Sequence, residues 1–186
     1  MFLTIFTPVY NRGKYVSRLF DSIDAQTVKN FEWIIINDGS TDNTDEEIRK
    51  NIARKKRKFD IEYIKVKNGG KPRAINKAVQ LTKGKYFFIV DSDDWLVPNV
   101  VELINDWCND IEQDSNFEKF AGVSGLREYP NEQINGGNGN GKLVIDATNL
   151  ERRKFNLGGD KGEVDLTDVH EIYIFDLVFY KNIIQE

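Results

Sequence analysis

The chain has 186 residues, of which 40% are hydrophobic and 30% charged, an ordinary balance for a globular protein of one domain or slightly more. Its formal net charge is −4, with 26 Lys and Arg against 30 Asp and Glu, so it lacks the basic surplus of proteins that wrap nucleic acids. Cys108 is the single cysteine, which excludes an internal disulfide and fits a reducing compartment.

The chain begins by alternating apolar runs with amphipathic segments. Residues 3–7 form an apolar run that is too short to span a bilayer and is typical of a buried strand. Asn11 can cap the helix that follows, in which apolar residues recur at i, i+3, i+4 and i+7 from Val16. A second strand is expected at residues 31–36, and a polar helix then runs to about residue 58.

The same alternation continues further along the chain. A third strand is expected at residues 61–66, followed by a helix that ends near Gly84. The most apolar strand, residues 86–90, leads directly into an acidic stretch, and a fourth helix begins near Pro98. This β-α-β-α-β-α-β-α order predicts an α/β fold, with a mainly parallel sheet and helices on both faces.

Beyond residue 114 the pattern is weaker. Residues 120–125 resemble a further strand, and the Gly- and Asn-rich residues 135–142 a loop or hairpin tip. Residues 143–186 contain short strand-like runs and one candidate helix near residues 147–155.

Polar residues stand at the end of each of the first four strands. They are Thr7, Pro8, Tyr10 and Asn11; Asp38, Gly39, Ser40 and Asp42; Asn68, Gly69, Gly70 and Lys71; and Asp91, Asp93 and Asp94. Because ligands of open parallel sheets bind beyond the carboxyl ends of the strands, these four loops predict one shared site.

The acidic residues 91–94 have two interpretations. Carboxylates crowded in this way repel one another, and a divalent cation that shares its ligands with substrate phosphates would relieve the repulsion. The same residues could instead cap the next helix and interact with its dipole.

The other loops also have two interpretations. Asp38 either accepts a hydrogen bond from a base or ribose, or belongs to a turn in which Thr41 or Asp42 caps the next helix. The Gly70 backbone and Lys71 either meet a diphosphate or form a plain turn with a solvated lysine.

Taken together, four ordered stretches resemble the family 2 glycosyltransferases of the GT-A fold. They are residues 7–11 (Thr-Pro-Val-Tyr-Asn), 38–42 (Asp-Gly-Ser-Thr-Asp), 68–71 (Asn-Gly-Gly-Lys) with Ala74 and Asn76, and 91–94 (Asp-Ser-Asp-Asp). The resemblance implies a Rossmann-like sheet in which residues 1–114 form a nucleotide-sugar-binding subdomain. Residues 115–186 would form part of an acceptor-side subdomain.

The resemblance also implies a reaction, in which a sugar passes with inversion from a nucleotide-sugar donor, often UDP-linked, to a glycan or lipid-linked acceptor. The donor-binding residues would be Thr7, Pro8, Tyr10, Asn11, Asp38, Gly70, Lys71, Asn76, Asp91 and Ser92. Asp93 would coordinate Mn²⁺ or Mg²⁺, with Asp91 reaching the ion through a water. The ion would neutralise the charge that builds on the departing nucleoside diphosphate.

Two departures from the family pattern stand out. Ile75 occupies the position where many relatives have an arginine, although Arg73 lies close by. The family's acidic base motif is not evident, and Asp160 and Glu163 are weak candidates for the catalytic base. We therefore expect a truncated chain, with a catalytically incomplete nucleotide-sugar-binding module as the alternative function.

Other readings remain open. A nucleotidyltransferase of similar topology and an α/β protein that binds no nucleotide are further candidate classes. His170 is either a metal ligand or structural, and Trp95 packs either in the core or on a sugar. The basic residues 54–58 are either a contact for anionic lipid or a solvated helix end. By analogy, relatives suggest a cytoplasmic protein with peripheral association at the inner membrane face.

Overall fold

The computed structural model describes residues 2–115, 117, 122–128, 144–146, 161–166 and 177–185. Its helices are α1 (Gly13–Asp24), α2 (Thr44–Ala53), α3 (Lys71–Val79) and α4 (Val100–Glu112). Its strands are β1 (Leu3–Val9), β2 (Phe31–Asn37), β3 (Asp60–Lys65), β4 (Tyr86–Ile89), β5 (Trp95–Leu96), β6 (Gly122–Glu128), β7 (Val144–Asp146), β8 (Lys161–Leu166) and β9 (Leu177–Gln185).

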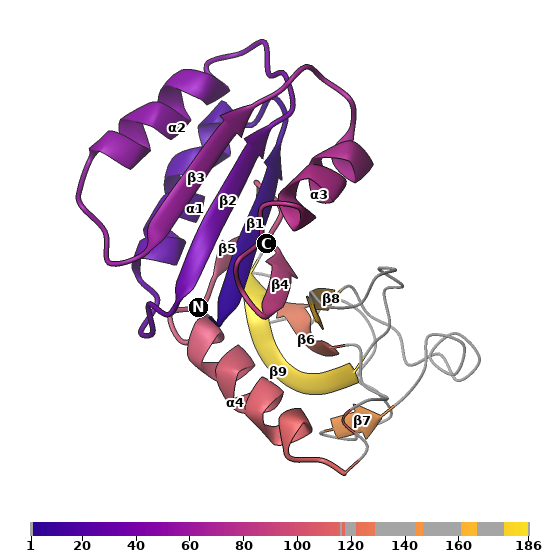
Figure 1. Cartoon of the computed structure of the whole chain (residues 1–186). Coiled ribbons are helices and arrows are strands. Elements are labelled where there is room, and N and C mark those ends of the chain that lie inside the picture. The colour runs from indigo at the N-terminus through magenta and orange to yellow at the C-terminus, as the bar shows by residue number, and fades with distance from the viewer. Residues whose placement is uncertain are drawn as a thin grey trace.

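These strands form one sheet with the order β3-β2-β1-β4-β8-β6-β9-β5, and β7 pairs with β9 (Figure 1). The first four strands in this order are parallel, with Leu3 of β1 opposite both Phe31 of β2 and Tyr86 of β4. Beyond them, β8 runs antiparallel to both β4 and β6. The predicted α/β class and parallel sheet are therefore confirmed in the first half of the chain.

Helices cover both faces of the sheet, as predicted. Neighbouring residues of a strand point to opposite faces, and Ile5 and Phe6 accordingly belong to two separate hydrophobic clusters. Residues of α1, α2 and α4 pack in the cluster of Ile5, whereas Ala74 and Ala78 of α3 pack in the cluster of Phe6. Because both faces are buried in this way, β2 is apolar almost throughout and has no exposed residue.

Two local predictions are wrong. The residue that caps α1 is Arg12, without a side-chain cap, whereas Asn11 adopts a left-handed conformation with φ of 53°. The Asn11 side chain instead accepts a hydrogen bond from the backbone N–H of Thr41, at 2.8 Å. Helix α2 ends at Ala53, about one turn before the predicted end.

The early end of α2 follows from a buried ion pair in the basic residues 54–58. Arg57 bonds both carboxylate oxygens of Asp24, at 2.8 and 3.1 Å, and only 5% of each side chain is exposed. Its guanidinium also donates to the carbonyl oxygens of Asn51 and Ile52, which the end of α2 leaves available. Arg57 is thus a structural residue, and neither of the two interpretations offered for this run describes it.

In the second half, the strand expected at residues 120–125 is observed as β6, with bounds Gly122–Glu128. The short strand β5 was not predicted from the sequence. The short strand-like runs expected in residues 143–186 are observed as β7, β8 and β9. The loop or hairpin expected at 135–142 and the helix expected at 147–155 lie outside the described residues. The boundary expected near residue 114 stays a prediction, although strands from both sides of it share one sheet.

Candidate functional site

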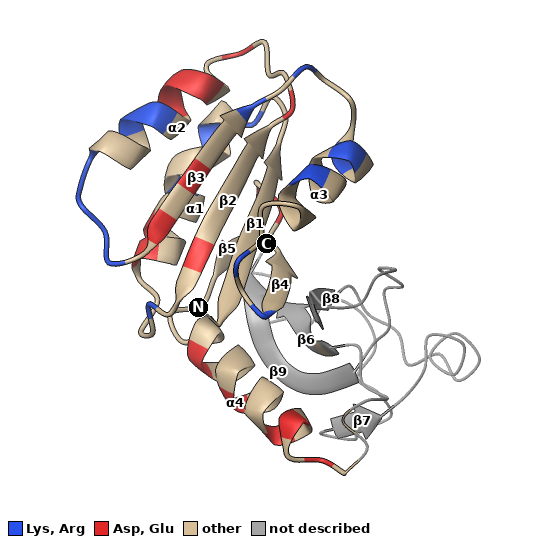
Figure 2. Cartoon of the chain, viewed as in Figure 1, with Lys and Arg blue, Asp and Glu red and all other residues tan. Residues whose placement is uncertain are grey.

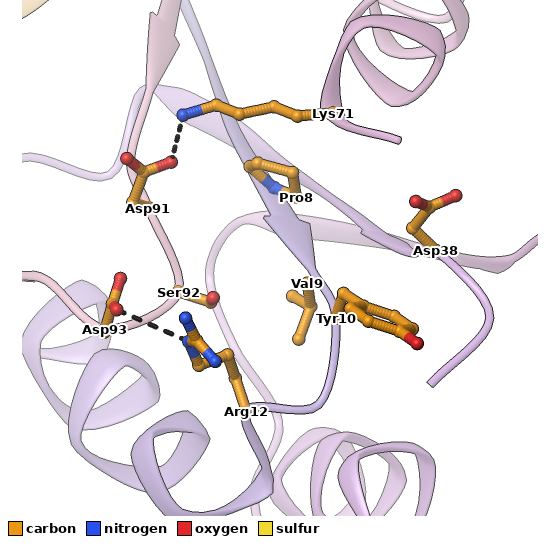
Figure 3. Close-up of a pocket in the computed structure, with 9 residues that line it drawn as sticks. All are labelled: Pro8, Val9, Tyr10, Arg12, Asp38, Lys71, Asp91, Ser92 and Asp93. Atoms are coloured by element: carbon orange, nitrogen blue, oxygen red, sulfur yellow. Dashed lines mark hydrogen bonds and ion pairs between the residues drawn. The ribbon is translucent and has the colours of Figure 1, made fainter. Parts of the chain in front are cut away.

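A cavity of about 390 Å³ opens at the carboxyl ends of β1, β2 and β4, beside the start of α3 (Figure 3). Its lining residues are Pro8, Val9, Tyr10, Arg12, Asp38, Lys71, Asp91, Ser92 and Asp93. The cavity therefore lies where the order of the loops predicts a shared site. In Figure 3, Tyr10 and Asp38 lie on one side of the cavity, and Asp91 and Asp93 lie on the other.

Asp38 joins three of the loops around this cavity. Its backbone N–H donates to the carbonyl oxygen of Val9, at 2.8 Å. Its carboxylate accepts hydrogen bonds from the backbone N–H groups of Gly69 and Gly70, at 2.8 and 2.7 Å. The side chain is nearly buried, so these bonds also satisfy a charge removed from water. A carboxylate has about four acceptor positions, so Asp38 keeps the capacity to bind a ligand.

Gly39 allows this arrangement. Its φ of +73° lies in the left-handed region, and a Cβ atom there would stand 2.6 Å from the backbone nitrogen of Asn68. A side chain at position 39 would therefore push the loop of residues 68–70 away from Asp38.

Asp91 and Asp93 are each paired with a cation across the cavity. Lys71 Nζ lies 2.6 Å from Asp91 Oδ1, and Arg12 Nε lies 3.4 Å from Asp93 Oδ2 (Figure 3). All four side chains remain partly exposed, from 29% for Asp91 to 50% for Lys71. A ligand from solvent can therefore reach both ion pairs.

The backbone of the acidic loop is held from α1. Arg18 donates from Nη2 to the carbonyl oxygen of Asp93, at 2.7 Å, and its guanidinium lies 3.6 Å from the centroid of the Trp95 ring. One face of the Trp95 ring is therefore covered by Arg18 and is closed to a sugar.

The loop of residues 38–42 holds the starts of α1 and α2 together. Ser40 Oγ accepts the backbone N–H of Asn11 at 3.0 Å, and Asp42 accepts the first N–H groups of both helices, from Gly13 at 3.4 Å and Thr44 at 3.0 Å. Burial raises the pKa of Asp42, but the hydrogen bonds from Thr44 and Gly13 outweigh burial and hold it below its usual value. The residue that caps α2 is Asn43, so the cap expected at Thr41 or Asp42 is misplaced, although the Asp42 side chain does bind the first N–H of the helix.

The structure brings together most of the predicted donor-binding residues. Pro8, Tyr10, Asp38, Lys71, Asp91, Ser92 and Asp93 line the cavity, and the N–H of Gly70 meets Asp38 below it. Thr7 is buried beneath, where its hydroxyl accepts a hydrogen bond from the Trp33 indole at 3.0 Å. Asn11 holds the adjoining loop, and Asn76 is exposed further along α3.

Other predicted residues lie elsewhere, and some lining residues were not predicted. Asp160 and His170 lie outside the described residues, and Glu163 lies in β8 opposite Ser124 of β6. Arg12 and Val9 also line the cavity but were not predicted from the sequence. Val9 ends β1 and Arg12 lies in the loop that follows, and the arginine beside an expected acidic site is the signal that could have identified Arg12.

Asp91 and Asp93 offer hard oxygen ligands of the kind that Mg²⁺ and Mn²⁺ prefer. Within the described part of the chain, no group of three or more His, Cys, Asp or Glu side chains is arranged to hold a metal ion. Two carboxylates fit an ion that completes its coordination with substrate phosphates and water.

No helix among the described residues combines the length and apolar character needed to cross a membrane.

Sequence comparison identifies the family. The model of glycosyl transferase family 2 matches residues 4–135, and the chain belongs to this family. Chondroitin synthase of Pasteurella multocida (strain Pm70) is 44% identical over 101 residues, which are 54% of this chain and 10% of that protein. The matched part of the chain thus spans about a tenth of this relative's length.

Comparison with solved structures confirms the GT-A fold. TarS 1-349 of S. aureus in complex with UDP matches with a TM-score of 0.74 at 18% identity, over 100% of this chain and 60% of that chain. The mannosyltransferase PcManGT of Pyrobaculum calidifontis in complex with GDP-Man and Mn²⁺ matches with a TM-score of 0.64 at 14% identity, over 99% of this chain and 56% of that chain.

Proposed function

We propose that the chain binds a nucleoside-diphosphate sugar in this cavity and forms the donor side of an inverting, metal-dependent glycosyltransferase. The acceptor would be a glycan or a lipid-linked glycan. The observation that carries this proposal is the convergence of Asp38, Lys71, Asp91 and Asp93 on one cavity of about 390 Å³. This volume suits a ligand of nucleotide size.

The two sides of the cavity suggest how the donor lies. Tyr10 is 47% exposed and lies beside Asp38 (Figure 3), so these two residues offer an aromatic surface and a hydrogen-bond acceptor for the base. The opposite side carries Lys71, Asp91 and Asp93, which suit a diphosphate and its divalent cation. When bound, the cation would neutralise charge on the leaving diphosphate.

In this arrangement Asp93 would bind the cation directly, and Asp91 would bind it through a water. Lys71 would place its ammonium near the phosphate oxygens, and the start of α3 would face the same negative charge. The ligands of the structural relatives, UDP in TarS and GDP-Man with Mn²⁺ in PcManGT, support a nucleotide donor and a divalent cation here.

Calorimetric titration of UDP, with and without Mn²⁺, tests donor binding. We expect binding that depends on Mn²⁺ and that Asp93→Ala weakens at least about tenfold, because a tenfold loss corresponds to only about 1.4 kcal/mol. Asp106→Ala, an exposed carboxylate on α4, is the matched control and should bind like the wild type. A protein that binds none of UDP, GDP and dTDP would contradict the proposal.

Transfer is a separate test, because donor binding does not require the acceptor side. Incubation with a UDP-sugar and an oligosaccharide acceptor, followed by mass spectrometry, would detect a lengthened product. Transfer that Glu163→Gln abolishes would identify this residue as the candidate base. Donor binding without transfer would assign the narrower function of a donor-binding module.

A position at the inner face of the membrane is part of the proposal by analogy, and vesicle flotation would test it.

A further inference from the structure

Two of the three carboxylates that line the donor cavity are paired with cations before any ligand enters. Arg12 pairs with Asp93 and Lys71 pairs with Asp91, whereas Asp38 accepts backbone N–H groups, so the lining carries a single formal negative charge. A divalent cation arriving alone would compete with both pairs and leave the cavity with excess positive charge. A diphosphate that arrives with the ion supplies the negative charge that restores the balance.

We infer that Arg12 and Lys71 are exchangeable counter-ions of the acidic pair. They hold Asp91 and Asp93 before the donor binds, and they turn to the diphosphate when a divalent cation takes the carboxylates. The cation therefore binds together with the nucleoside diphosphate and not before it. This inference rests on the proposed function and adds to it the order of binding and a role for Arg12.

The geometry around Arg12 suits such an exchange. Its side chain is 43% exposed and that of Asp93 is 47% exposed, and their ion pair at 3.4 Å is long. The backbones on both sides are held, because the N–H of Arg12 donates to Thr44 Oγ1 at 2.9 Å and Arg18 holds the carbonyl oxygen of Asp93 at 2.7 Å. The two side chains can thus change partners while the loops that carry them stay in place.

Lys71 supplies the second cation from a basic helix. Helix α3 contains Lys71, Arg73 and Lys77 and no acidic residue (Figure 2). The Lys71 side chain is half exposed, so its ammonium is accessible to a phosphate. A diphosphate at the start of α3 would meet this positive charge together with the positive end of the helix dipole.

The number of carboxylates supports binding of the cation and the nucleotide together. Ions such as Mg²⁺ take roughly six oxygen ligands, and Asp91 and Asp93 line the cavity as two side chains. Phosphate oxygens and water would supply most of the remaining ligands. The affinity for the ion should therefore rise sharply once the nucleotide is present.

The test measures Mn²⁺ binding by the electron paramagnetic resonance of free Mn²⁺, without UDP and with saturating UDP. In the wild type we expect weak binding of Mn²⁺ alone and binding at least about tenfold tighter with UDP. Arg12→Gln and Lys71→Gln should each strengthen binding of Mn²⁺ alone several-fold and weaken calorimetric UDP binding in Mn²⁺. A residue that merely supported the fold would weaken both.

Matched controls exclude a general effect of charge. Lys14→Gln removes a cation from the first turn of α1, two residues after Arg12, where Lys14 lies over the Tyr15 ring at 4.6 Å. Lys77→Gln removes a cation from α3, the helix that contains Lys71. Both should leave the two affinities unchanged, because neither residue lines the cavity. Far-ultraviolet circular dichroism of each variant verifies the fold.

Two results would overturn the inference without touching the proposed function. One is Mn²⁺ binding as tight without UDP as with it, and the other is Arg12→Gln and Lys71→Gln variants that do not bind Mn²⁺ alone more tightly than the wild type. If the wild type binds no nucleotide at all, the proposed function fails and this inference fails with it.

Discussion

Asp38 Oδ2 accepts a hydrogen bond of 2.7 Å from the backbone N–H of Gly70, the residue that caps α3. This bond ties the end of β2 to the start of the helix that carries Lys71. Asp38, which the resemblance assigns to the nucleotide base, therefore also positions Lys71, the side chain that we propose for the diphosphate.

Asp38→Asn should loosen the start of α3. The amide has one acceptor oxygen in place of two and presents an NH₂ group to a backbone N–H. Because hydrogen bonds to charged groups contribute about 1.5–3 kcal/mol, we expect the free energy of unfolding to fall by about 2 kcal/mol. Urea unfolding measures this loss, and hydrogen exchange should accelerate at Gly69 and Gly70. Asp60→Asn, at an exposed position of β3, should leave both unchanged.

Gly39→Ala and Gly70→Ala form a matched pair. Both glycines have positive φ, +73° and +86°, but a Cβ at Gly39 would stand 2.6 Å from the Asn68 nitrogen, whereas one at Gly70 would meet only Pro72, at 3.8 Å. Gly70→Ala should cost about 1–3 kcal/mol of backbone strain, because its ψ of 158° lies in a region essentially confined to glycine. Gly39→Ala should cost more, because the steric clash adds to its own backbone strain. Equal losses in urea unfolding would show that the contact with Asn68 does not constrain the loop.

Asp24→Asn should destabilise the protein in a pH-dependent way. Burial raises the pKa of Asp24, but hydrogen bonds from Arg57 and Lys55 outweigh burial and hold it below the usual value. The ionised carboxylate therefore stabilises the fold fully above the unfolded-state pKa of about 3.9. This contribution is lost as the pH falls through the lower folded-state pKa.

At pH 7 we expect Asp24→Asn to lower the free energy of unfolding by about 3 kcal/mol, because Arg57 would lose its buried partner. The difference from the wild type should shrink between about pH 5 and about pH 2. Asp21→Asn is the control on the same helix, since Asp21 pairs with Arg54 but is 63% exposed, and it should cost less than about 1 kcal/mol. A difference for Asp24→Asn that did not change with pH would contradict the assignment.

Arg18→Met should weaken donor binding more than it weakens the fold. It removes the hydrogen bond to the Asp93 carbonyl oxygen and the guanidinium over Trp95, an exposed contact of about 0.5–1 kcal/mol. We expect UDP affinity in Mn²⁺ to fall several-fold, with partial recovery in Arg18→Lys. Lys14→Met on the same helix should have no effect on calorimetric binding. Unchanged UDP affinity in Arg18→Met would show that Arg18 does not position the acidic loop.

The position of the site was predictable because it depends on local features. An apolar run followed by turn-forming and acidic residues identifies the end of a buried strand, and parallel strands bring such ends to one edge. Asp38, Lys71 and Asp91 could therefore be assigned to the same cavity from sequence alone.

Contacts between distant residues were not predictable in this way. Arg18 and Asp93 are 75 residues apart, and an exposed arginine on a helix gives no sign of its partner. The end of α2 was misplaced for a similar reason. Residues 54–58 suit the end of a helix by composition, but the buried pair between Arg57 and Asp24 directs the chain away from the helix axis.

The short strand β5 has a practical consequence for trimming the chain. Trp95 and Leu96 follow the acidic loop directly, and they pair with Gln185 and Ile184 of β9. The last described strand thus holds the backbone of the two residues that directly follow the acidic loop. Deleting β9 would remove the strand that pairs with Trp95 and Leu96. The acidic loop next to them would be affected, even though the deleted residues are far from it in sequence. A minimal donor-binding protein cut near residue 114 should therefore be supplied with a replacement strand.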